Sequence, residues 1–147
     1  MNNTSVILLI QAGDRRLLFC GDAQIENWEY ALSFAPDRKA ILDLLREVDL
    51  YKVGHHGSRN ATPRTLFNLW TEPTTRDRAM TALMSTKPGV FPGKPGSGTE
   101  VPRQTLLTAL RQRMPLHSTM DLAAGASHVE VSAPAFGDAE FTVVGNG

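Results

Sequence analysis

Two short polar segments, each following an apolar run, carry the side chains best suited to chemistry. Residues 20–23 read CGDA and residues 52–58 read KVGHHGS, so Asp22, His55 and His56 each come just after an expected strand. Carboxylate oxygen and imidazole nitrogen are ligands of zinc, and nearby glycines let such side chains stand clear of a strand. Because a hydrolytic zinc site takes three or four protein ligands, these residues predict a metal site that is incomplete in this chain.

The other candidate groups give weaker signals. His117 and His128 have no ligand spacing to either segment, so we expect structural or surface roles for both. Cys20, at a strand end with no histidine base near it in the sequence, is expected to be a small core residue. The glycine-rich residues 93–99 lack the spacing of a phosphate-binding loop and read as a loop near the active edge, where Lys94 or Arg103 is a minor candidate for contacting an anionic substrate.

Composition excludes several classes of protein. The 147 residues are 41% hydrophobic, which suits one soluble domain with a core over 1–147. With 15 basic and 15 acidic residues, the chain lacks the net positive charge needed for tight, sequence-independent binding to nucleic acid. Nucleic acid is still a candidate substrate. No apolar run is long enough to span a membrane, no secretory signal is evident, and one cysteine allows no internal disulfide, so we expect a cytoplasmic protein.

Strands alternate with helices along most of the chain. Strands are expected at residues 5–10, 15–20, 48–53 and 80–84, and near 128–132 and 140–144. Helices are expected over 26–32, from Pro36 to about Val48, after an N-cap at Thr62, and from Pro102. Apolar residues at helical spacing mark their buried faces: Ile41, Leu44, Leu45, Val48, Leu66, Leu69, Trp70, Leu106, Leu107, Leu110 and Met114. This order predicts an α/β fold, a mixed sheet with flanking helices.

The order of these motifs resembles the C-terminal half of the metallo-β-lactamase-fold hydrolases. Within that superfamily it is most similar to the hydrolase domain attached to bacterial DNA-uptake channels of the ComEC type and to its free-standing relatives. The resemblance is carried by residues 2–9 (NNTSVILL), 17–23 (LLFCGDA), 49–58 (DLYKVGHHGS) and 118–121 (STMD). It covers most of the chain, and its two strongest pieces are specific only in combination.

The resemblance implies an αββα sandwich that binds one or two metal ions, usually zinc and sometimes manganese or iron, at one edge between two sheets. The matching aspartate, Asp22, would bridge the metals, and a histidine of the second motif would complete the second site. The related Gly-His-Gly form favours His56 as that ligand, which leaves His55 to contact substrate or donate a proton; the reverse assignment stays open. Ser58 would bond to the turn or to a substrate oxygen, and Arg103 is a further substrate candidate.

The chain departs from the family in one large respect. The main ligand cluster of these hydrolases, a His-x-His-x-Asp-His loop, belongs to their N-terminal half, and nothing in this sequence matches it. We therefore expect the chain to correspond to a C-terminal half whose ligand-bearing N-terminal half is absent, through a truncated gene, a split gene, a cloned fragment or an internal start. A second chain that carries the missing N-terminal half is therefore a candidate partner.

Two functional hypotheses follow. The first is a partial metal-dependent hydrolase, acting in a complete relative on a phosphodiester in nucleic acid or a nucleotide, with the isolated chain weakly active or inactive. In it Asp22 is the bridging ligand, His56 the second ligand and a metal-bound water the nucleophile. The alternative is a non-catalytic module or gene fragment that needs a partner, because half of a sandwich would leave one apolar sheet face uncovered.

Overall fold

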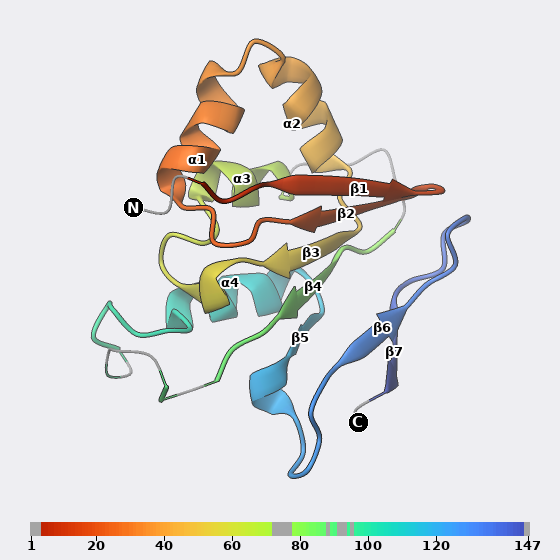
Figure 1. The fold of residues 1–147 in the computed structure, drawn as a ribbon. Helices are drawn as coiled ribbons and strands as arrows, with labels where there is room; N and C mark the ends of the chain where they lie inside the picture. Colours follow the sequence, from red (N-terminus) through yellow and green to blue (C-terminus); the bar gives the residue numbers. More distant parts are fainter. Residues whose placement is uncertain (1–3, 72–77, 88, 91–93, 95, 146–147) are drawn as a thin grey trace.

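A single mixed sheet organises the computed structural model, which describes residues 4–71, 78–87, 89–90, 94 and 96–145 (Figure 1). The sheet has the order β1-β2-β3-β4-β5, with strands Leu8–Ala12, Arg15–Phe19, Leu50–Val53, Thr81–Met84 and Leu116–Ser118. β1 and β2 form an antiparallel hairpin, and β2 through β5 are parallel neighbours. The chain is therefore α/β, which confirms the predicted mixed sheet with flanking helices.

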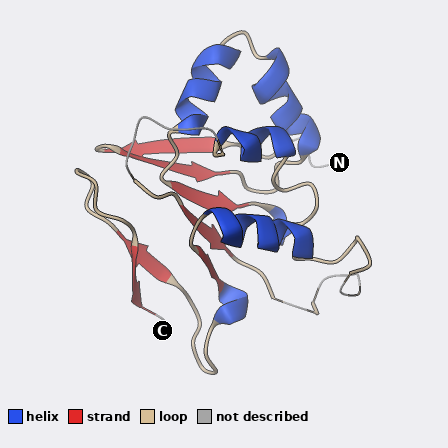
Figure 2. Cartoon of the chain, turned by 180° about the vertical axis from the view of Figure 1, so that it is seen from behind, coloured by secondary structure: helices blue, strands red, loops and turns tan. Residues whose placement is uncertain are grey.

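The helices connect the parallel strands. They are α1 (Ile25–Glu29), a π-helical turn (Tyr30–Phe34), α2 (Arg38–Arg46), α3 (Arg64–Leu69) and α4 (Gln104–Arg113). Figures 1 and 2 show α3 and α4 against one face of the sheet, and α1 and α2 standing beside its β1 edge. A separate antiparallel pair, β6 (Glu130–Ser132) and β7 (Thr142–Gly145), lies beyond β5.

The core fills the space between these helices and one face of the sheet. Leu18, Tyr51 and Ala82 are directly opposed across β2, β3 and β4 and are all fully buried. The Tyr51 ring packs against Trp70 with ring centroids 4.8 Å apart. From the helices, the packing residues are Trp28, Leu32, Leu45, Leu66, Leu69, Leu107 and Leu110. Directly opposed residues share a face, so alternate residues of each strand form this core layer.

Several sequence expectations need correction. Leu44 is 40% exposed, not buried, because α2 turns Leu45 instead toward the core. Thr62 does not cap α3, which begins at Arg64; its hydroxyl shares a hydrogen bond of 2.8 Å with the Tyr51 hydroxyl instead. The short strand β5 was not predicted. The proposed helix at 26–32 ends at Glu29 and continues as a π-helical turn.

The opposite face of the sheet is largely apolar and only partly covered. Register places Leu8, Ile10, Leu17, Phe19 and Leu83 on it together with Lys52 and His117, and we call it the open face. Leu8 is 49% exposed and Ile10 is 41% exposed. Within the described part of the chain no helix lies over it (Figures 1 and 2). Leu17, Phe19 and Leu83 are half-buried, so among the described residues the face is uncovered mainly at β1.

Candidate functional site at the carboxyl ends of the parallel strands

The predicted metal ligands follow neighbouring strands at one edge of the sheet. Asp22 follows β2, and His55 and His56 follow β3, its parallel neighbour, so all three come after strand carboxyl ends that face the same way. The two segments also touch, because the His55 N–H donates to the Gly21 carbonyl over 3.1 Å. In open α/β sheets this edge is where ligands usually bind. The structure thus brings the two sequence motifs to one place.

Gly54 permits this close approach of the two segments. A Cβ atom at Gly54 would lie 2.5 Å from the Gly21 carbonyl oxygen, which is shorter than any tolerable contact. Gly54 itself has an ordinary φ of −77°, so its role is space, whereas Gly21 turns the chain with a φ of +51°. The glycines that the sequence marked as flexible turns therefore act in two different ways.

His55 and His56 both adopt left-handed backbone conformations, with φ values of 43° and 54°. They are the only non-glycine residues with positive φ in the described chain. Such conformations cost roughly 1–3 kcal/mol each and persist where the surroundings impose them, often at functional sites. Strain confined to the two predicted imidazoles points to a role beyond folding.

The two imidazoles differ in their hydrogen bonds. His56 Nδ1 lies 2.9 Å from the Ser85 carbonyl oxygen, and since a carbonyl only accepts, this contact places a proton on Nδ1; in the neutral imidazole Nε2 is then the nitrogen with the lone pair. His55 Nδ1 lies 2.9 Å from the buried Ser58 hydroxyl, and either group can donate. His56 is exposed and His55 half-buried. His56 thus has the hydrogen bonding usual for a metal-ligating histidine.

Lys52 is a charged residue of this edge that the sequence did not single out. It lies on β3, and the Asp22 carboxylate is close enough to influence its ionisation. Burial lowers the pKa of the Lys52 ammonium, and the electrostatic influence of the nearby Cys20 and Asp22 groups opposes that shift. Its position three residues before His55 could have indicated a lysine near the site. Strand periodicity alone, however, does not distinguish a lysine of a functional site from an ordinary surface lysine.

The described residues do not hold enough donors for a metal centre. They contain no group of three or more His, Cys, Asp or Glu side chains arranged to hold one ion. Asp22, which is exposed, and His56 fit zinc by donor chemistry, but they provide two ligands where three or four are needed. The donor set therefore fits the metal in kind and falls short in number.

The loop before α4 contacts the histidine motif through its backbone. The Arg103 N–H donates to the Gly57 carbonyl over 2.8 Å. The Arg103 guanidinium bonds both carboxylate oxygens of Glu100, and Glu100 also accepts the Gly98 N–H at 2.7 Å. These bonds give Arg103 a structural role in shaping the loop, while Lys94 is exposed. Residues 93 and 95 of the glycine-rich stretch lie outside the described chain.

The remaining candidates lie as expected. Cys20 is fully buried, and burial raises the pKa of its thiol to about 12, so the thiolate is scarce at neutral pH. This confirms Cys20 as a core residue. His128 is exposed, and His117 is half-buried on β5 in register with Leu83.

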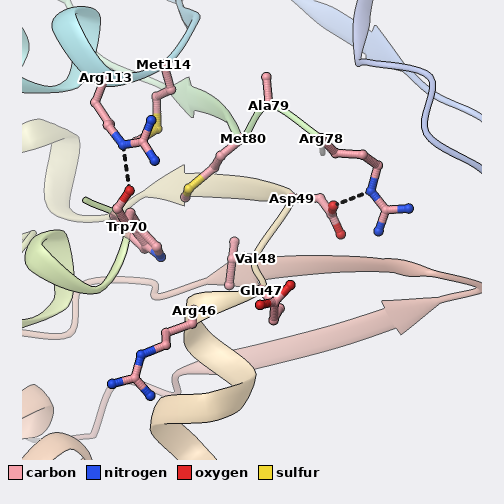
Figure 3. A pocket seen from close by; sticks show the side chains of 10 residues that line it. All are labelled: Arg46, Glu47, Val48, Asp49, Trp70, Arg78, Ala79, Met80, Arg113 and Met114. Carbon is pink, nitrogen blue, oxygen red and sulfur yellow. Dashed lines mark hydrogen bonds and ion pairs between the residues drawn. The ribbon is translucent and has the colours of Figure 1, made fainter. Parts of the chain in front are cut away.

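A partly open hollow lies at the other end of the sheet. Its volume is about 80 Å³, and it is lined by residues around the start of β3 and β4 and the end of α4 (Figure 3). There Arg78 Nε donates to Asp49 over 2.9 Å, and Arg113 donates to the Trp70 carbonyl. These charged groups are occupied with one another and with the backbone, so the hollow does not resemble a reaction site.

Comparison of the chain with models of protein families, with curated proteins and with solved structures finds no match. None of the helices among the described residues is long and apolar enough to cross a membrane. Any function inferred for the chain therefore depends on the residues and geometry of this edge of the sheet, together with the sequence resemblance to metallo-β-lactamase-fold hydrolases.

Proposed function

We propose that this chain supplies two ligand-bearing motifs, centred on Asp22 and His56, to a metal-dependent hydrolytic centre. The observation that carries the proposal is their meeting at adjacent carboxyl ends of β2 and β3, joined by the 3.1 Å hydrogen bond from His55 to Gly21. A carboxylate and a neutral imidazole with a lone pair on Nε2 are the donors that zinc, manganese and iron accept in hydrolases. The resemblance to metallo-β-lactamase-fold hydrolases supports the same assignment.

The chain's own groups would divide the work around such an ion. A bound metal supplies a water of lowered pKa. Asp22 offers two carboxylate oxygens, and His56 is oriented by the Ser85 carbonyl. His55, whose Nδ1 bonds Ser58, is placed to contact substrate or to carry a proton. The Lys52 ammonium adds positive charge beside Asp22, which favours an anionic substrate such as a phosphodiester.

A titration of the ¹⁵N-labelled chain with zinc, followed by NMR, tests this function. We expect binding weaker than about 1 μM, because two ligands leave most coordination positions to water, with shifts confined to the segments around Asp22 and His56. Asp22→Asn should abolish those shifts, and the exposed Asp37→Asn should leave them unchanged. Zinc that perturbs neither segment would refute the site, and submicromolar affinity lost in Asp22→Ala would refute its incompleteness.

A second candidate, a non-catalytic module docked on a partner, is favoured by the open face. Exposed apolar patches of more than a few hundred Å² usually mark association sites, and Leu8 and Ile10 lie side by side on one face of β1. A partner covering this face could also bring the missing ligands to the same edge. Size-exclusion chromatography separates the cases, since a well-behaved monomer that shows no association speaks against a missing partner. Leu8→Thr/Ile10→Thr is the matched variant, expected to reduce any association.

A further inference from the structure

We propose that Thr119 is a positioning residue that fixes the tautomer of His56 through the Ser85–Thr86 peptide group. His56 is taken here as a ligand, so its importance for metal binding depends on the function proposed above. The hydrogen-bond geometry itself does not depend on a metal. Thr119 follows β5, two strands away from the histidine motif in the sheet order, and is half-buried.

One peptide group connects the two side chains. Its carbonyl, belonging to Ser85, accepts the proton on His56 Nδ1 at 2.9 Å. Its N–H, belonging to Thr86, donates to Thr119 Oγ1 at 2.9 Å. The Thr119 hydroxyl in turn donates to the Thr86 carbonyl at 2.7 Å. The peptide is therefore held at both ends, by an imidazole on one side and a hydroxyl on the other.

The position of Thr119 explains why a side chain is needed there. Pairing between β4 and β5 ends at Met84 and Ser118, so no strand partner holds the next peptide of the β4 segment. The Thr119 hydroxyl takes over as both donor and acceptor for Thr86. Without it, the peptide could rotate and turn its carbonyl away from the imidazole.

Hydrogen bonds in such a chain reinforce one another. Donation by an amide N–H polarises its own carbonyl, which then accepts more strongly from Nδ1. A firm acceptor at Nδ1 keeps the proton there and leaves Nε2 as the lone-pair nitrogen, the form that a metal requires. Thr119 thus acts on His56 across the peptide without touching it in any hydrogen bond of the described structure.

The test is the tautomeric state of His56 in the metal-free chain, read from the two ring ¹⁵N shifts and assigned with His56→Gln. In the wild type we expect the neutral His56 imidazole to be protonated at Nδ1 alone. Thr119→Val keeps the β-branched shape and removes the hydroxyl, so signals of the Nε2-protonated form should appear. Thr119→Ser, which restores the hydroxyl, should recover the wild-type pattern.

Thr86→Val is the matched control. The Thr86 hydroxyl is buried and has no hydrogen-bond partner among the described residues, so removing it alters the same loop without breaking the chain of bonds. We expect the His56 shifts to stay unchanged in this variant. A change as large as that in Thr119→Val would mean that any disturbance of the loop moves the imidazole, which would overturn the proposal.

Two further outcomes overturn the inference. One is a wild-type His56 protonated at Nε2, which decides the matter even if Thr119→Val does not fold. The other is a Thr119→Val chain whose His56 keeps the wild-type tautomer. Zinc affinity tests the proposed function separately, and we expect it to fall about 10- to 100-fold in Thr119→Val. If the tautomer changes in Thr119→Val but no variant binds zinc, the positioning role of Thr119 holds and the metal role of His56 is refuted.

Discussion

The two ends of the sheet both gather polar side chains, but they do so in opposite ways. At the amino ends of the strands, Asp49 and Arg78 are buried, with side chains 3% and 5% exposed, and each bonds several partners. At the carboxyl ends, Asp22 and His56 are exposed, and the histidine backbone is strained. At the amino end the charged side chains stabilise the fold, whereas at the carboxyl end the polar side chains are exposed to solvent.

The amino end shows what a structural polar cluster looks like in this molecule. The Arg78 guanidinium joins the turn of the β1–β2 hairpin at Asp14, the start of β3 at Asp49 and the loop before β7 at Gly137. Arg15 bonds carbonyls of the same loop and lies over the Phe141 ring. Buried hydrogen bonds and ion pairs between distant segments stabilise the tertiary structure. Exposed polar side chains on a strained backbone add little stability but are accessible to a ligand.

Replacing Asp49 should cost the most stability. Asp49→Ala leaves the buried Arg78 with only the exposed Asp138 carboxylate and the Arg16 N–H without its acceptor, so we expect a loss of about 3–5 kcal/mol in the free energy of unfolding. Asp43→Ala, which breaks only exposed pairs on α2, should change stability far less, because solvent screens such pairs. Urea denaturation measures both. Equal losses would remove the distinction drawn for the amino end.

Alkaline pH should destabilise the core through Cys20. Burial raises the pKa of this thiol from 9.0 to about 12, so above pH 9 the unfolded chain loses a proton that the folded chain keeps. Stability attributable to the thiol is therefore complete below pH 9 and declines up to pH 12, by roughly 3 kcal/mol at pH 11. The difference between wild type and Cys20→Ala, measured by denaturation in reductant from pH 8 to 11, isolates this effect from that of Tyr51, whose pKa burial also raises. A constant difference would contradict the raised pKa.

At the carboxyl end, removing His56 should not destabilise the fold. His56→Gly relieves a left-handed backbone and removes the exposed hydrogen bond to the Ser85 carbonyl, so stability should stay level or rise by up to about 1 kcal/mol. Arg59→Gly, an exposed change nearby at a residue without positive φ, should instead lower stability by up to about 1 kcal/mol. Opposite signs in thermal or urea unfolding would confirm that strain is stored at the motif. A loss in both variants would count against it.

Asp22 should matter least for stability. Its carboxylate is exposed and forms no hydrogen bond within the described chain, so Asp22→Asn should change the free energy of unfolding by no more than about 0.5 kcal/mol. The same variant should lose the zinc-induced NMR shifts entirely. A destabilisation comparable to that of Asp49→Ala would make Asp22 a structural residue and erase the contrast between the two ends.

Local signals in the sequence were enough for the elements that have strong periodicity or turn chemistry. β1, β2, α2 and α4 follow from runs of strand-favouring residues and from helical spacing, and Asp22 and His56 could be placed because each comes just after an expected strand. β5 was missed because a three-residue strand has no readable period.

Contacts between distant residues were not predictable from one sequence. Thr62 reads as a helix cap, but its hydroxyl is taken by Tyr51 from β3. The pairing of Asp49 with Arg78 and the link from Thr119 through Thr86 toward His56 join residues about 30 positions apart. Neither pattern nor propensity reports such pairs, since they depend on which strands become neighbours.

The most direct test is anomalous diffraction at the zinc edge from crystals soaked in millimolar zinc. If Asp22 and His56 share a cation, the strongest peak should lie about 2.0–2.2 Å from an Asp22 carboxylate oxygen and from His56 Nε2 together. Zinc bound only at other histidines, or at Asp22 with His56 turned away, would contradict the proposed site.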